Sequence, residues 1–355
     1  MEDKVHGVFV GEKVSKVRWK PEDLVESDIF LTGSWDNETN HLVLWLYPPN
    51  EDDADIYPCT IGTHPYDGDI TELKFINSNM FVVSSTVGSV KLLKIDGKEP
   101  CLAALKEVMS WDDIHFLSVG GHIPCTGLAV FEEDIVSVGE DGCLCLLTAR
   151  QKMPVRRIEG ADSCSLRCVC FLKHNEVLTG NLRGQMKVWD LKNAVNKPAS
   201  TFMLSGEQTG ASCVTHHPTQ RHMVLAGGED GSLTVWDLRH HTFPVTLLSA
   251  HSDAVSELQF HPDRPEHLFT CSTSGEIWHW NTSSMSRSAH LGTMPSEFPR
   301  DENLWLNSDV AKHRLEVFTL MPQLHKPINS LDVSKNRVVC GCDNEAVYVF
   351  KNVVL

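Results

Sequence analysis

A thirteen-residue segment recurs along the chain, and this internal repetition constrains the fold more than any other feature of the sequence. Five copies align without gaps, at Val83–Ile95, Ser137–Ala149, Thr179–Leu191, Ala226–Leu238 and Thr270–Thr282. A sixth copy, starting at Thr32, fits with a longer turn, and a seventh, starting at Cys340, fits without the turn glycine. Copies of this kind are expected to stack as repeated structural units, because one unit cannot bury its apolar faces alone.

Each repeat has the pattern of two strands joined by a tight turn. In the unit at Met223–Leu238, the apolar run Met223–Leu225 leads into Gly227–Gly231, where glycine and aspartate favour a turn. Apolar residues then alternate with the outward-facing Thr234 at the period of a strand. Several units are preceded by a further strand, and a proline such as Pro262 ends that strand. The sequence therefore predicts an all-β protein.

The spacing of the repeats predicts a seven-bladed β-propeller. One large apolar residue closes each copy, and these residues are Trp45, Leu93, Leu147, Trp189, Trp236, Trp280 and Phe350. Their successive separations are 48, 54, 42, 47, 44 and 70 residues, and most are near the 40–45 residues of a four-stranded blade. We expect Trp45, Trp189, Trp236, Trp280 and Phe350 to face the core as the structural centre of their repeats.

The last repeat is one strand short, which suggests how the ring closes. We expect Val5–Val10 to pair with the strand that contains Val347–Phe350, because a closed ring leaves no open sheet edge. Residues 1–355 are then one propeller domain with irregular insertions near 50–58, 96–122 and 281–325. Such loops either carry binding sites or are disordered decoration, and the sequence favours neither reading.

Composition excludes several classes of function. The formal net charge of −16 disfavours direct binding of nucleic acid, and there is no basic run to offset it. No apolar stretch approaches the length of a membrane-spanning helix, and Met1–Lys4 lacks the features of a signal peptide, so we expect no membrane insertion. In a cytosolic protein the 12 cysteines are expected to be reduced.

The motifs of metal, cofactor and enzyme sites are missing. Cys143-x-Cys145 and Cys340-x-Cys342 lack the spacing of a zinc site and fit small core residues on one face of a strand. No nucleophile elbow, P-loop or dinucleotide fingerprint occurs. Gly227–Gly231 could resemble a phosphate loop, but it leads into a strand and not a helix. We therefore expect no enzyme activity, no cofactor and no metal.

Two of the repeats identify a family. Val188-Trp189-Asp190 and Val235-Trp236-Asp237 resemble the signature of WD repeats, whose blades join a His, a turn Asp, a Ser or Thr and a Trp in one network. No repeat in this chain shows all four members. The fifth lacks a clear His, and in the sixth, which has His251, Ser274 stands where Asp is expected.

The whole chain also resembles a narrower family, that of the forty-three-kilodalton nucleoporin. The matching stretches include Lys13–Lys16, Gly33–Glu38, Val138–Gly142 and Pro265–Ser272. Arg18-Trp19 and Trp278-His279-Trp280 are more specific, because generic WD repeats do not carry them, whereas Asp96–Gly121 and Ser283–Asn307 match poorly.

The resemblance implies a non-enzymatic scaffold in the Y-shaped subcomplex of the nuclear pore, at the nuclear envelope. It also implies a part in pore assembly and in the transport of mRNA and protein, and association with kinetochores in mitosis. The implied partners are other nucleoporins, in particular a helical solenoid, the eighty-five-kilodalton nucleoporin, but no docking residue can be assigned. An adaptor propeller for a ubiquitin ligase or chromatin complex, and a propeller enzyme, remain as alternatives.

Overall fold

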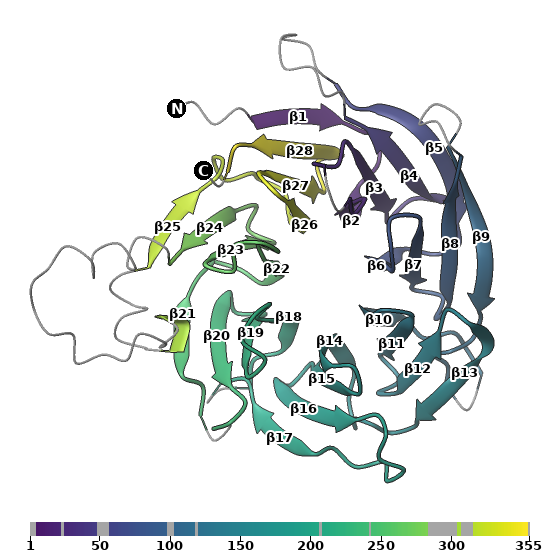
Figure 1. Ribbon diagram of the computed structural model, residues 1–355, viewed down its shortest axis with the longest axis vertical. Helices are drawn as coiled ribbons and strands as arrows, with labels where there is room; N and C mark the ends of the chain where they lie inside the picture. Colours follow the sequence, from purple (N-terminus) through teal and green to yellow (C-terminus); the bar gives the residue numbers. More distant parts are fainter. Residues whose placement is uncertain are drawn as a thin grey trace, which may run out of the picture.

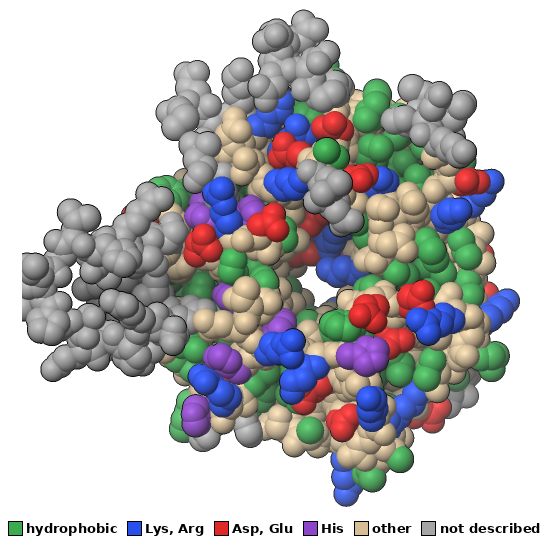
Figure 2. All heavy atoms as spheres, in the orientation of Figure 1, with side chains coloured by type: hydrophobic (Ala, Val, Ile, Leu, Met, Phe, Trp, Pro, Cys, Tyr) green, Lys and Arg blue, Asp and Glu red, His purple; other side chains and the backbone are tan. Residues whose placement is uncertain are grey.

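Seven four-stranded antiparallel sheets form a ring in the described part of the chain (Figure 1), and Figure 2 shows the open channel at its centre. The computed structural model describes residues 5–22, 25–47, 57–97, 103–117, 120–205, 208–240, 243–282, 304–306 and 315–353. Each sheet is one blade, and successive blades follow one another around the ring, so the predicted seven-bladed propeller is confirmed.

Strands of the same rank occupy equivalent places in every blade. The first strands, nearest the channel, are β2 (Val14–Trp19), β6 (Ile70–Phe75), β10 (Cys125–Phe131), β14 (Leu166–Lys173), β18 (Ala211–His216), β22 (Val255–Phe260) and β26 (Ile328–Ser334). The second strands are β3 (Ile29–Ser34), β7 (Met80–Ser85), β11 (Asp134–Gly139), β15 (Glu176–Asn181), β19 (Met223–Gly228), β23 (His267–Ser272) and β27 (Arg337–Cys342). The third strands are β4 (Asn40–Leu46), β8 (Val90–Asp96), β12 (Leu144–Thr148), β16 (Gln185–Asp190), β20 (Ser232–Asp237), β24 (Ile277–Asn281) and β28 (Ala346–Lys351). The outer strands are β5 (Cys59–Tyr66), β9 (Ala104–Trp111), β13 (Gln151–Ile158), β17 (Ser200–Met203), β21 (Thr246–Ser249), β25 (Glu316–Thr319) and β1 (Val5–Phe9).

The hydrophobic core lies between the blades. The second strands are covered on both faces, and every residue of β19, β23 and β27 is buried. Apolar clusters join each blade to the next; between blades 7 and 1, for example, Val339 and Val347 pack with Val14 and Trp19. Burying a large apolar side chain contributes about 1.5–3 kcal/mol, so the contacts between blades hold the ring together.

The N-terminal strand closes the ring, as predicted. β1 pairs antiparallel with β28, from Val5 opposite Phe350 to Phe9 opposite Ala346. The last blade therefore has the strand order β1-β28-β27-β26, and the two ends of the described chain lie in the same sheet (Figure 1). Closure occupies the backbone groups that an open edge would leave unpaired.

The turn between the second and third strands requires left-handed backbone. Gly231 has φ of 79°, and an added Cβ would lie 2.2 Å from the carbonyl oxygen of His251. Glycine fits there because it has no side chain to collide. In blade 7, which lacks the glycine, Glu345 adopts φ of 62° at the equivalent turn.

The insertions expected to be irregular contain regular structure. The segment 96–122 includes β9, the outer strand of blade 2, and 281–325 includes β25, the outer strand of blade 6. These strands escaped prediction because outer strands are exposed and lack the apolar alternation of half-buried strands. A short 3₁₀ helix, η2 (Leu304–Leu306), buries Trp305 against Phe260 and Trp280. The insertion near 50–58 lies outside the described residues up to residue 56, as do 283–303 and 307–314.

Candidate functional site

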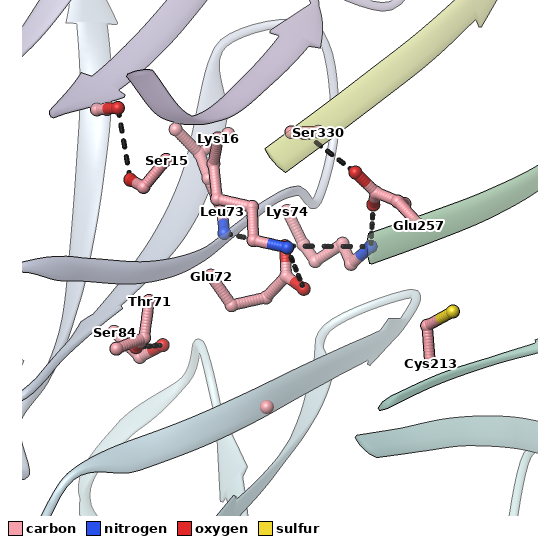
Figure 3. Close-up of polar contacts among 12 residues, drawn as sticks. Ser15, Lys16, Thr71, Glu72, Leu73, Lys74, Ser84, Cys213, Glu257 and Ser330 are labelled. Carbon is pink, nitrogen blue, oxygen red and sulfur yellow. Dashed lines mark hydrogen bonds and ion pairs between the residues drawn. The ribbon is translucent and has the colours of Figure 1, made fainter. Parts of the chain in front are cut away.

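Charged side chains from four blades meet in the central channel, a cavity of about 620 Å³. We call this group the channel cluster, and its members are Lys16, Arg18, Glu72, Lys74, Glu257 and Asp332. They come from the first strands β2, β6, β22 and β26. Figure 3 shows Glu72 and Lys74 of β6 and Glu257 of β22 reaching toward the same space.

Arg18 is the centre of the channel cluster. Its Nη2 donates to Glu72 Oε1 at 2.9 Å and also to Glu257 Oε1. Its Nη1 donates to Ser330 Oγ at 2.9 Å, and its Nε donates to the carbonyl oxygen of Leu73 at 3.0 Å. One guanidinium on blade 1 therefore bonds to blades 2, 6 and 7, which suits the fixed, forked donors of arginine.

The charged members of the channel cluster shift one another's pKa values. Burial opposes ionisation of Glu257, but Arg18, Lys16 and Lys74 lower the pKa of that carboxyl well below its usual range. Burial likewise opposes the cation at Arg18, yet Glu257 and Glu72 raise the pKa of Arg18. For Asp332 burial prevails and raises the pKa. The cluster is thus a compensated set of buried charges.

The chemistry of the channel cluster is that of a clamp. Arg18 and Lys16 pair with Glu72 and Glu257, and Asp332 accepts the backbone N–H of Trp19 at 2.6 Å. Breaking such a buried pair by removing one partner is strongly destabilising. The sequence marked Arg18-Trp19 as unusual, but Glu72 and Glu257 were missed because their approach depends on the curvature of the ring.

Blade 3 contains a histidine network that sequence reasoning did not identify. The Nδ1 of His115 lies 2.9 Å from Asp141 Oδ1, and its Nε2 lies 3.0 Å from Ser137 Oγ. Burial opposes the charged form, but Cys125 and Asp141 favour it and raise the pKa of His115 to about 9. His115 was missed because it lies in a segment expected to be irregular. Ser137 and Asp141 are spaced as in a WD network, and this spacing could have indicated a histidine partner.

Blade 6 has the equivalent network with different members. The Nε2 of His251 lies 2.8 Å from Thr270 Oγ1, and its Nδ1 lies 3.3 Å from Glu276 Oε2. Trp280 donates its indole N–H to Thr270 Oγ1 at 2.9 Å. Ser274 stands at the turn position expected for Asp and donates to Glu276 Oε2 at 2.9 Å. Burial lowers the pKa of His251 despite Glu276.

The structure places the predicted repeat residues inside the blades. Each belongs to its own blade, so the ring does not bring them together at one site, and all are buried: Trp45, Leu93, Leu147, Trp189, Trp236, Trp280 and Phe350. The indoles of Trp45 and Trp189 donate to Thr32 at 2.9 Å and Thr179 at 3.1 Å.

Blade 5 breaks the indole pattern of its neighbours. Ala226 occupies the position of the threonine, and the indole N–H of the buried Trp236 has no hydrogen-bond partner among the described residues.

The described residues contain no group of three or more His, Cys, Asp or Glu arranged to hold a metal ion. All described cysteines are free, and the C-x-C pairs Cys143/Cys145 and Cys340/Cys342 are buried. Burial raises the pKa of the Cys143 and Cys342 thiols, which keeps them in the unreactive form. No helix in the described ranges is long and apolar enough to cross a membrane.

Comparison with known proteins identifies the family. Residues 197–237 and 242–281 match the family model described as WD domain, G-beta repeat. The chain is 37% identical over 383 residues to Nucleoporin Nup43 of Homo sapiens, covering 99% of both chains, and 36% identical to that of Mus musculus, covering 98% of both. It is 21% identical to nuclear pore complex protein NUP43 of Arabidopsis thaliana, covering 98% of this chain and 97% of the relative. None of these descriptions is that of an enzyme. The chain belongs to the Nup43 family of nucleoporins.

Proposed function

We propose that this chain is a non-enzymatic scaffold subunit of the Y-shaped subcomplex of the nuclear pore. There it supports pore assembly and, through the pore, the transport of mRNA and protein. The observation that carries the proposal is the identity of 37% to a nucleoporin over 99% of both chains. Full coverage matters because similarity confined to the repeats would support only the propeller fold.

The architecture suits a scaffold. Neighbouring blades share their cores, the ring is closed by β1, and Arg18 bonds to three other blades across the channel. A rigid ring of this kind presents loops and rims whose relative positions stay fixed, and long-lived assemblies need such surfaces.

The partner within the pore is, in this proposal, a helical-solenoid nucleoporin of eighty-five kilodaltons. A contact that lasts in an assembled pore needs an interface of standard size or larger, about 1,600 Å² in total. Burial in the interface should dominate its affinity, so moderate salt should slow association without dissolving the complex. In mitosis the same subcomplex would carry the chain to kinetochores.

The test is reconstitution followed by localisation. The purified chain and the candidate solenoid are mixed and separated by size exclusion at moderate salt, with a WD propeller of another family as the matched control. Co-elution of this chain alone, and a tagged copy at the nuclear rim, are expected. Failure to co-elute together with absence from the rim would reject the pore assignment, and purification from cells with ligase or chromatin subunits would then favour the adaptor alternative.

A further inference from the structure

A second cavity, of about 760 Å³, opens on the face of the ring that carries the loops between first and second strands. It lies over blades 2 to 5, at the ends of β6, β10, β14 and β18. We call it the cationic groove. Its basic lining residues are Lys74, Lys173, His174, His216 and Arg221.

The positive charge of the cationic groove comes mainly from its Lys and Arg side chains, because burial lowers the pKa of His216 and His174 lies 3.8 Å from Asp134 Oδ2. No Asp or Glu occurs among its lining residues, although the chain carries a net charge of −16. Arg221 is exposed and forms no ion pair with a described residue. Lys173 pairs with Glu176 at 2.9 Å, but its side chain is 59% exposed, so solvent screens that pair. Figure 2 shows Lys, Arg and His side chains beside the central opening on the lower side of the view, with Asp and Glu side chains next to them.

The floor of the cationic groove is apolar and aromatic. Phe75, Phe131 and Phe171 line it together with Val214. The rings of Phe131 and Phe171 lie 5.7 Å apart, and the ring of Phe131 lies 5.5 Å from that of His174. Phe75 and Phe131 are only partly buried, so each offers apolar area that a bound side chain could cover.

We propose that the cationic groove binds an acidic peptide segment of a partner protein, with a Leu or Phe side chain on the aromatic floor and flanking carboxylates on Arg221 and Lys173. Charge complementarity decides the chemistry of the occupant, because an apolar floor under a cationic rim fits an anchor flanked by acids. A nucleic acid would also meet cations here, but it would have to extend past a chain whose net charge repels phosphate.

Lys74 links the groove to the channel cluster and supports an anionic occupant. Its Nζ lies 3.8 Å from Glu72 Oε1 and 3.9 Å from Glu257 Oε1, longer than a direct hydrogen bond. Burial and the nearby Arg18 lower the pKa of Lys74. A carboxylate that enters from the groove would supply Lys74 with a direct acceptor.

This proposal goes beyond the role in the pore and does not depend on it. The probe is a fluorescein-labelled peptide of sequence Glu-Asp-Glu-Leu-Phe-Asp-Glu, followed by fluorescence polarisation with the full chain. The double variant Arg221→Glu/Lys173→Glu reverses the rim. The matched control is Arg183→Glu/Lys152→Glu, which makes the same change of net charge at exposed positions outside the groove. Thermal unfolding checks that all variants fold.

Saturable binding that weakens with salt, falls about tenfold or more in the rim variant and stays within about twofold of wild type in the control is expected. No saturable binding, or equal losses in both variants, would overturn the proposal. So would binding of a labelled oligo-dT of similar charge as tightly as the peptide, which would make the groove a nucleic-acid site. A failure here leaves reconstitution with the solenoid unaffected, so the two proposals fail separately.

Discussion

Blades 3 and 6 each have a histidine at the boundary with the preceding blade, at equivalent positions. The pKa shifts of these two imidazole side chains nevertheless have opposite signs. His115 in blade 3 has its pKa raised to about 9, whereas burial lowers the pKa of His251 in blade 6. Both side chains are buried and both face a hydroxyl and a carboxylate. Cys125, which has no counterpart beside His251, accounts for part of the difference, and the hydroxyl and the carboxylate account for the rest.

The third-strand residue changes what the hydroxyl oxygen accepts. In blade 6 the Thr270 oxygen accepts from Trp280 and keeps one lone pair, and its own hydrogen can be directed to Nε2 of a neutral His251 at 2.8 Å. In blade 3 the equivalent residue is Leu147, and the Ser137 oxygen is free to accept from a protonated His115.

The carboxylates differ in the same direction. Asp141 is 4% exposed and 2.9 Å from His115, while Glu276 is 20% exposed and 3.3 Å from His251. A closer and more buried anion stabilises an adjacent cation more strongly. The same positions of the repeat thus hold an ion pair in blade 3 and a chain of neutral hydrogen bonds in blade 6.

The largest effect is expected from removing the two carboxylates. Asp141→Asn should lower the free energy of unfolding at pH 6 by about 3 kcal/mol, because it leaves a buried cation without its partner. Glu276→Gln should cost less than about 1 kcal/mol. Urea denaturation of both variants measures the difference, and equal losses would show that the two networks do not differ in charge.

The second prediction concerns pH. His115, with its pKa raised to about 9, contributes stability that is complete below pH 6.5 and is lost as the pH rises toward 9. In blade 6, burial and the neighbouring His267 and His261 lower the pKa of His279 to about 4, so its contribution is complete above pH 6.5 and is lost as the pH falls toward 4. A plot of the free energy of unfolding against pH should therefore fall at both ends, with an alkaline limb and an acid limb. Each of these two groups contributes a slope of up to about 1.4 kcal/mol per pH unit.

Variants assign the two limbs. Asp141→Asn should flatten the alkaline limb of the stability profile and leave the acid limb. His279→Gln, which keeps a hydrogen-bonding group for His267 but does not titrate, should reduce the slope of the acid limb without abolishing it, because burial also lowers the pKa of His217 to about 4. If both variants change the same limb, the assignment of charge to blade 3 and neutrality to blade 6 is wrong.

A smaller gain is expected in blade 5, which has the tryptophan without the hydroxyl. Ala226→Ser should give the indole N–H of Trp236 an acceptor and raise the free energy of unfolding by about 1 kcal/mol. Serine adds one oxygen to a fully buried site, so Ala226→Val serves as the control that adds bulk without an acceptor. A loss in stability equal to that of the control would mean that packing at residue 226 outweighs the hydrogen bond.

The smallest expected effect on stability comes from a variant that separates the contribution of the carboxylate from that of the hydroxyl to the pKa difference between His115 and His251. Ser274→Asp combined with Glu276→Ser moves the carboxylate of blade 6 to the turn position that Asp141 holds in blade 3. We expect the pKa of His251, followed by NMR, to rise but to stay below that of His115, because Thr270 still accepts from Trp280. The gain in stability at pH 6 should remain under about 1 kcal/mol. A pKa equal to that of His115 would assign the whole difference to the carboxylate.

The ring and its closure could be predicted because they depend on periodic features of the sequence. The regular spacing of residues such as Trp189 and Trp236 marks successive blades. The last repeat is one strand short, so its sheet needed a strand from elsewhere in the chain, such as Val5–Val10. Outer strands such as β9 and β13 could not be predicted in the same way. Their residues are mostly exposed, so no apolar alternation marks them.

The candidate sites depend on contacts that no local pattern records. His115 bonds to residues of the next blade across the loop between β9 and β10, and no Gly-His pair marks its role in the sequence. Glu72 and Glu257 meet Arg18 only because the first strands of distant repeats converge on the channel. The cationic groove likewise combines the ends of four strands with residues of the loops that follow them, so no single segment of the sequence contains it.

Closure by β1 also sets the order in which the protein can mature. A ribosome produces Val5–Phe9 long before Ala346–Lys351, at about 5–20 residues per second, so β1 waits for its partner on the order of tens of seconds. During that time the nascent chain is an open arc of blades in which β1 has no partner strand. Binding of β1 by another nascent copy would exchange the strand between two molecules, so chaperones would protect this fold most in the interval before the ring closes.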